Sequence, residues 1–94
     1  MRLIMYGKPG CHLCEGLKEK LAQVKTTLDF ELEVRNIYDR QEWVDAYQAA
    51  IPILYLVPDE IAGEAGAISI PRPSPRASVE QLTKTLQKYF AASK

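Results

Sequence analysis

Cys11 and Cys14 are the only cysteines of the chain, and two residues separate them. This C-x-x-C pair follows a short apolar stretch, residues 3–6, and opens a segment of helical periodicity, residues 15–28. A C-x-x-C pair at a strand-to-helix turn of a small α/β chain is typical of a thiol–disulfide exchange site. We therefore predict that the two thiols alternate between a dithiol and a disulfide.

The predicted position of Cys11 at a helix N-terminus favours its thiolate form. The first turn of a helix leaves backbone N–H groups unpaired and carries a partial positive charge, which stabilises an anion. The thiolate is the nucleophile of thiol chemistry. Cys14 lies one helical turn further along the same face, so it can reach Cys11 and resolve a mixed disulfide formed there.

Three other interpretations of the pair compete with exchange chemistry. A structural disulfide would close a very short loop, which stabilises the fold little, and a reducing compartment disfavours it. A zinc site needs four ligands. His12 is the only histidine and there is no second C-x-x-C, so we expect no metal site within one chain. The third alternative is an interaction domain whose cysteine pair is idle.

Length, composition and charge set bounds on the function. The 94 residues are enough for one domain, residues 1–94, and 47% hydrophobic with 26% charged residues is ordinary for a globular protein. Lys and Arg together number 12, and Asp and Glu together also number 12, so the net charge is close to zero. We therefore expect no bulk attraction to nucleic acid or to anionic membranes. No apolar run approaches the roughly 20 residues that span a bilayer, and the N-terminus lacks a signal-peptide core. We therefore expect a cytoplasmic protein, with its thiols kept reduced.

The segments around the cysteines predict a buried strand and an amphipathic helix. Residues 2–6 form a short apolar run that ends at Gly7, which is typical of a central strand. The helix that follows should bury one stripe of side chains, formed by Leu13, Leu17, Leu21, Val24 and Leu28.

The middle of the chain predicts an edge strand and a short helix. Residues 30–37 alternate strictly between apolar and polar side chains, which favours a strand with one covered face. Asp39 is predicted to cap the helix, and Glu42 would complete a capping box. Trp43 and Tyr47 lie one turn apart, and we expect them to pack in the core rather than to hold a ligand.

The remaining residues predict a hairpin and a last helix. Residues 51–57 are apolar with a proline near the start, where a strand tolerates it, and a turn at residues 58–59 leads to a second strand within residues 60–70. The proline-rich residues 71–76 exclude a helix or a central strand. Ser78 and Gln81 form a capping box for a helix whose apolar face comprises Val79, Leu82, Leu86, Tyr89 and Phe90.

In chain order these elements form a β-α-β-α-β-β-α arrangement. The first β-α-β unit requires parallel pairing with a right-handed crossover, and the later strand pair is a hairpin. We therefore predict an α/β fold in which helices flank a central mixed four-stranded sheet. This arrangement resembles the thioredoxin-like fold.

Two segments carry a resemblance to a known family. Residues 6–14, YGKPGCHLC, resemble the active-site opening of glutaredoxins, and residues 50–52, AIP, resemble the cis-proline step of thioredoxins and glutaredoxins. A branch of small bacterial glutaredoxin-like proteins is closer still, because it also carries K-x-G-C-x-L-C. Tyr6 matches an aromatic residue before the motif and is a candidate modulator of the site.

The resemblance implies roles for individual residues. Cys11 matches the nucleophilic cysteine and Cys14 the resolving one. Pro52 matches the cis-proline, and the preceding Ile51 would offer backbone hydrogen bonds to a bound peptide or glutathione. Lys8 matches the lysine that helps to hold a glutathione carboxylate.

The chain departs from the glutaredoxin pattern in two places. Proline and an aromatic residue usually stand between the cysteines, and here they are His12 and Leu13. A protonated His12 would stabilise a nearby thiolate, while the alternative is an exposed side chain without a role. The Gly-Gly turn and acidic helix start of the glutathione site have no clear counterpart in residues 69–78, where Arg72 or Arg76 would instead bind a carboxylate. His12 and Arg72 are further candidate modulators.

We predict a glutaredoxin-like thiol–disulfide oxidoreductase that reduces disulfides or glutathione mixed disulfides through Cys11 and Cys14. It would need no metal or organic cofactor, and glutathione is a candidate cosubstrate. Its partners would be glutathione, protein disulfides or both, and we expect a monomer. One alternative is a glutathione-independent protein disulfide reductase. Another is an iron–sulfur carrier in which Cys11 binds a cluster between two chains, as some glutaredoxins do with glutathione.

Overall fold

The computed structural model describes residues 1–58 and 66–92, and its elements follow the predicted order. The predicted turn residue Asp59 and the first part of the second hairpin strand, residues 60–65, lie outside the described residues. The elements are β1 (Arg2–Gly7), α1 (His12–Val24), β2 (Glu31–Asn36), the 3-10 helix η1 (Ile37–Asp39), α2 (Gln41–Tyr47), β3 (Ile53–Val57), β4 (Ile68–Ile70) and α3 (Val79–Ala92).

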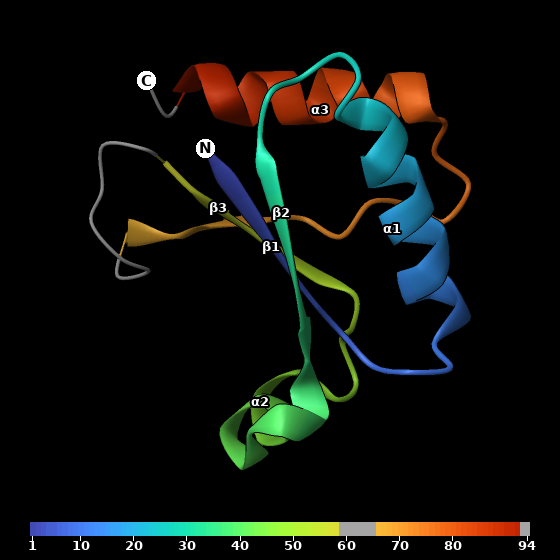
Figure 1. Ribbon diagram of the computed structural model, residues 1–94, viewed down its shortest axis with the longest axis vertical. Helices are drawn as coiled ribbons and strands as arrows, with labels where there is room; N and C mark the ends of the chain where they lie inside the picture. Colours follow the sequence, from blue (N-terminus) through green and yellow to red (C-terminus); the bar gives the residue numbers. More distant parts are fainter. Residues whose placement is uncertain (59–65, 93–94) are drawn as a thin grey trace.

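The strands form one mixed sheet in the order β2-β1-β3-β4 (Figure 1). β1 pairs in parallel with β2, with Leu3 opposite Leu32, and β3 pairs antiparallel with both β1 and β4. The predicted central position of β1, the edge position of β2 and the β3–β4 hairpin are confirmed. The parallel pairing follows because α1 carries the chain back to the starting end of the sheet.

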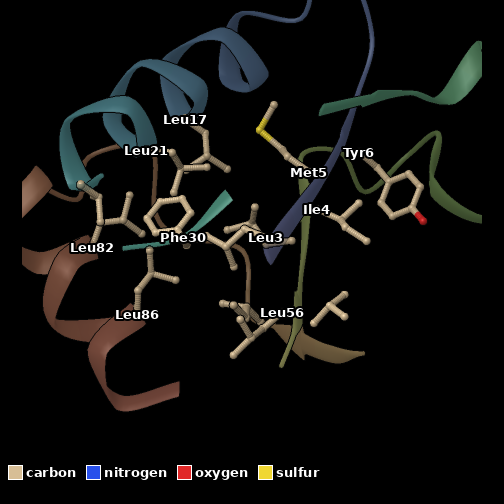
Figure 2. Close-up of a cluster of buried hydrophobic side chains, with 14 of the residues drawn as sticks. Leu3, Ile4, Met5, Tyr6, Leu17, Leu21, Phe30, Leu56, Leu82 and Leu86 are labelled. Carbon is tan, nitrogen blue, oxygen red and sulfur yellow. The ribbon is translucent and has the colours of Figure 1, made fainter. Parts of the chain in front are cut away.

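The two faces of the sheet are covered differently. Side chains alternate along β1, so Leu3 and Met5 point toward α1 and α3, while Ile4 and Tyr6 point to the opposite face (Figure 2). α1 and α3 pack on the first face, and the short α2 lies beyond the carboxyl end of β2 (Figure 1).

No helix in the described parts of the chain has the length and apolar character needed to cross a bilayer.

The buried stripe of α1 differs from the predicted one. α1 begins at His12, so Cys11 lies at the helix N-terminus as predicted, and it ends at Val24, before the last residue of the predicted stripe, Leu28. Its buried side chains are Cys14, Leu17, Leu21 and Val24, whereas Leu13 is 45% exposed. Both cysteines therefore belong to the helix start, and Cys14 takes the core position that the sequence assigned to Leu13.

The predicted cap of α2 is wrong. The residue before α2 is Arg40, which makes no side-chain capping bond, and Glu42 contacts the Arg40 guanidinium at 3.2 Å instead. The chain turns earlier than expected, because the side-chain oxygen of Asn36 accepts a bond from the Tyr38 N–H at 2.9 Å and starts η1. Asp39 is then the last residue of η1, one position too early to cap α2.

The predicted capping box of α3 is confirmed. The Gln81 N–H donates to the Ser78 hydroxyl at 3.1 Å, and the Ser78 N–H donates to the Gln81 side chain at 2.9 Å. The proline-rich residues 71–76 form an irregular connection, as predicted. The box fixes where α3 starts and so fixes the end of this connection next to α1.

Candidate active site

Cys11 is the N-cap residue of α1. Gly10 has φ +78°, which allows the sharp turn before the helix, and the Cys11 backbone is extended at φ −86° and ψ 108°. The Cys11 Sγ accepts a hydrogen bond from the Cys14 backbone N–H at 3.3 Å. The sulfur thus occupies the place that a serine or aspartate oxygen takes in an ordinary cap, at the positive end of the helix dipole. Cys11 is half-buried, so the rest of the protein covers it only in part.

Cys14 lies behind Cys11 in the core and is only 4% exposed. Burial raises the pKa of the Cys14 thiol from 9.0 to about 11, and the hydrogen bond with Cys11 adds to this shift. The two cysteines therefore have separate places, with Cys11 facing outward and Cys14 held as a protonated thiol inside.

Gly7 makes the close approach of Cys14 to the sheet possible. A Cβ atom at Gly7 would lie 3.0 Å from the Cys14 Sγ and 3.2 Å from its Cβ, which is tighter than nine in ten real Cβ contacts. Any other residue here would require the Cys14 side chain to shift by a few tenths of an ångström. From the sequence, Gly7 was predicted only to end the strand; its position directly before K-x-G-C was the available signal.

One cavity opens between the first turns of α1, Pro52 and the proline-rich connection, and we name it the proline-side cavity. Its volume is about 170 Å³. It brings together the predicted residues His12, Pro52 and Arg72, and Leu13 contributes its exposed side chain. The full lining is His12, Leu13, Gly16, Leu17, Lys20, Pro52, Arg72, Pro73, Ser74, Pro75, Ala77 and Leu82.

The two cations of the proline-side cavity bind backbone carbonyls of the protein. The Lys20 Nζ donates to the carbonyl oxygens of Pro75 at 2.8 Å and Ala77 at 2.7 Å. The Arg72 guanidinium donates to the Ile51 carbonyl at 3.4 Å. The rest of the surface that lines this cavity is largely apolar and is formed by aliphatic side chains and prolines. Sequence reasoning missed Lys20, because its partners lie more than fifty residues away.

The Ile51–Pro52 step borders this cavity, and its peptide bond is cis. The Ile51 N–H donates to the Tyr47 carbonyl at 3.1 Å, and the Ile51 carbonyl is the acceptor for Arg72. Both backbone groups of Ile51 thus have partners within the protein. A peptide could bond to the carbonyl only by displacing Arg72 or by sharing that oxygen with it.

A second cavity lies on the other side of the helix start, between α1 and β2, and we name it the glycine-side cavity. Its volume is about 300 Å³. Lys8 lines this cavity together with Cys14, so the structure separates Lys8 from Pro52 and Arg72 in the other cavity. The full lining is Met5, Gly7, Lys8, Pro9, Cys14, Glu15, Lys18, Val34, Arg35 and Asn36.

Tyr6 lies in an aromatic cluster on the face of the sheet opposite α1. Its ring centroid is 5.3 Å from that of Trp43 and 4.6 Å from that of Tyr47, and its hydroxyl accepts a bond from Arg35 at 3.0 Å. The prediction that Trp43 and Tyr47 pack against the core is confirmed, although both remain half-buried. Tyr6 therefore supports β1 from behind, and it lines neither of the two cavities.

The family comparison agrees with this geometry. A family model described as "Glutaredoxin-like domain (DUF836)" matches residues 2–87. The chain belongs to this glutaredoxin-like family. No curated protein matches the chain. The family suggests a function of the thiol–disulfide oxidoreductase type.

Solved structures show that the glutaredoxin-like chain has the thioredoxin fold. Thioredoxin 1 from the thermophilic eubacterium Thermosipho africanus TCF52B is similar with a TM-score of 0.62 and 16% identity, over 99% of this chain and 98% of that one. The Northeast Structural Genomics target protein XcR50 from X. campestris is similar with a TM-score of 0.59 and 23% identity, over 92% and 96% of the two chains. At these identities the likeness concerns the fold alone.

The acidic, histidine and cysteine side chains of the glutaredoxin-like chain bear on metal binding. Within residues 1–58 and 66–92, no group of three or more His, Cys, Asp or Glu side chains is placed to hold a metal ion. Cys11 and Cys14 stand together without a third such ligand in this part of the chain.

Proposed function

We propose that this glutaredoxin-like protein is a thiol–disulfide oxidoreductase that reduces disulfide substrates through the Cys11–Cys14 dithiol. The observation that carries the proposal is the position of Cys11, half-exposed at the N-cap of α1 with its sulfur bonded to the Cys14 N–H. A helix start stabilises the negative charge of a thiolate there. The reducing cytoplasm is the compartment that would keep this pair ready for reaction.

The proposed cycle has two displacements. The Cys11 thiolate attacks one sulfur of the substrate disulfide, forms a mixed disulfide and releases the other substrate sulfur as a thiolate, which takes up a proton. Cys14 then loses its proton and attacks the Cys11 Sγ, which breaks the mixed disulfide and releases the second substrate thiolate. The substrate gains two electrons, and the Cys11–Cys14 pair loses two. An external thiol, such as glutathione, restores the dithiol.

The proline-side cavity favours protein disulfides over glutathione as the substrate. Glutathione carries two carboxylates, which a site would normally bind with free cations or backbone N–H groups. Here Lys20 and Arg72 are bonded to carbonyl oxygens, while Leu13 and Pro52 present apolar surface to the same cavity. An uncharged side chain beside the substrate cysteine would fit this surface, and Lys8 lines the other cavity.

Turnover with glutathione tests which substrate class is right. The assay supplies a glutathione mixed disulfide, glutathione and glutathione reductase to the wild type and to Cys11→Ser. Activity that is lost by about a thousandfold or more in Cys11→Ser would establish a glutathione-linked reductase with Cys11 as nucleophile.

A parallel assay with a peptide disulfide and a chemical reductant completes the test. We expect faster turnover of a peptide with leucine beside its cysteine than of one with aspartate, with both rates lost in Cys11→Ser. No reaction with any disulfide, in a protein whose circular dichroism shows an intact fold, would contradict the proposed function.

A further inference from the structure

The second step of the proposed cycle needs a proton acceptor for Cys14. Its thiol is buried, and burial raises its pKa to about 11, so near neutral pH it keeps its proton. A thiol attacks only as the thiolate. Over the described residues, no polar or charged side chain is buried with it in the core. The proton must therefore leave toward solvent.

The glycine-side cavity is the exit that the structure offers. Cys14 lines it directly, together with Gly7, against which the Cys14 side chain packs closely. With a volume of about 300 Å³, this cavity has room for several water molecules. The proline-side cavity does not include Cys14 among its lining residues.

Glu15 is the one carboxylate among the described residues that line the glycine-side cavity. The other charged groups there are Lys8 from the loop, Lys18 from α1 and Arg35 from β2. Charged ammonium and guanidinium groups have no lone pair with which to accept a proton. A carboxylate oxygen can accept one, either directly or through one water molecule.

We propose that Glu15 accepts the Cys14 proton across the glycine-side cavity when the mixed disulfide on Cys11 is resolved. This inference rests on the proposed function. The S–H proton passes to Glu15, the new Cys14 thiolate forms the bond to the Cys11 Sγ, and the bond from Cys11 to the substrate sulfur breaks. Glu15 then returns the proton to the departing thiolate or to solvent, so charge and electrons balance.

Replacing Glu15 by glutamine separates this role from a purely electrostatic one. The Glu15 charge contributes to the raised pKa of Cys14, after burial and the Cys11 contacts. If charge were the whole effect, Glu15→Gln would make Cys14 easier to ionise and would speed resolution. A lost proton acceptor slows resolution instead. The sign of the change therefore decides between the two roles.

The experiment uses a mixed disulfide between thionitrobenzoate and a cysteine-containing peptide as the probe. Attack by Cys11 releases the coloured thionitrobenzoate and leaves the peptide on Cys11, and stopped-flow absorbance follows this first phase. Acid quenching and mass spectrometry follow the second phase, in which the peptide leaves. We expect Glu15→Gln to keep the first phase and to slow the second by about a hundredfold at neutral pH, the low end for a general base.

The pH profile and two further variants complete the test. In Glu15→Gln the second phase should rise with hydroxide concentration and approach the wild-type rate at alkaline pH, and Glu15→Asp should recover most of the rate. Glu19→Gln is the matched control, an exposed glutamate on α1 outside the cavity lining, and should leave both phases unchanged. A second phase in Glu15→Gln as fast as or faster than in the wild type would overturn the inference. A missing first phase in the wild type would instead refute the proposed function.

Discussion

The two cavities that flank the start of α1 differ in the chemistry they present. The proline-side cavity is the smaller, about 170 Å³ against about 300 Å³, and the cations that line it are bonded to backbone carbonyls. The glycine-side cavity is lined by Lys8, Lys18, Arg35 and Glu15 and reaches the buried Cys14. One side is suited to hold an apolar part of a substrate, and the other to move a proton.

The helix itself produces this division. Successive residues of an α-helix point about 100° apart, so neighbours in the sequence face different sides. His12 and Leu13 face the proline-side cavity, and the next two residues, Cys14 and Glu15, face the glycine-side cavity. Four successive residues of one regular helix, residues 12–15, therefore line two separate cavities.

The largest effect on stability that we expect concerns the buried thiol of the glycine-side cavity. The pKa of Cys14 is about 11 in the folded protein, above its ordinary value of 9.0, so folding favours the protonated form. This contribution is fully present below pH 9 and is lost as pH rises toward 11. Between pH 9 and pH 11, we expect the free energy of unfolding of the reduced wild type to fall by about 2 to 3 kcal/mol more than that of Cys14→Ala.

Denaturant titrations under a reductant at several pH values measure this difference. The pKa of Tyr47 is also raised, to about 12, chiefly by its hydrogen bond with Tyr55 and then by burial. That tyrosine is present in both proteins, so the comparison with Cys14→Ala cancels its effect. Parallel stability curves for the two proteins would show that Cys14 is not buried as a protonated thiol.

A matched pair of glycine substitutions compares the two cavities directly. In Gly7→Ala the new methyl group meets the Cys14 sulfur, and overpacking of this kind costs about 1 to 3 kcal/mol. Gly16 lines the proline-side cavity, where a Cβ atom would meet nothing within 4 Å. Gly16→Ala should therefore stabilise α1, by about 0.5 to 1 kcal/mol. Urea unfolding of both variants measures these changes, and equal effects of the two substitutions would contradict the packing described here.

A smaller effect is expected for Lys20→Met. Lys20 closes the proline-side cavity by donating to the carbonyls of Pro75 and Ala77, and hydrogen bonds from a charged group of this kind contribute about 1 to 2 kcal/mol when partly exposed. Lys18→Met is the control on the opposite side of the same helix and should change stability by less than about 0.5 kcal/mol.

Thermal or urea unfolding compares the two lysine variants. Amide hydrogen exchange should also rise in residues 71–77 of Lys20→Met and stay unchanged in Lys18→Met, because Lys20 is the one of these two lysines that donates hydrogen bonds to the proline-rich connection. Identical exchange in the two variants would show that the connection is held by its other contacts alone.

Much of the fold was predictable because its signals are local. The strand within residues 30–37, the apolar run of β1 and the pair Ser78 and Gln81 each depend on neighbours within four positions, and the structure confirms all three. The predicted covered face of that strand is wrong at Val34, which is 46% exposed. The prediction for Asp39 failed although it was also local, because Asn36 offered a competing cap that started the turn earlier.

The sequence by itself determined the order of the elements, the mixed sheet and the place of the C-x-x-C pair at a helix start, since periodicity and turn residues act over short distances. The tertiary structure alone decided that Cys14 rather than Leu13 enters the core, and that Lys8 and Pro52 face different cavities. It alone decided that Lys20 binds a connection more than fifty residues away. These features depend on how α1 is rotated against β1 and the proline-rich connection, and that rotation is set by packing between segments far apart in the chain.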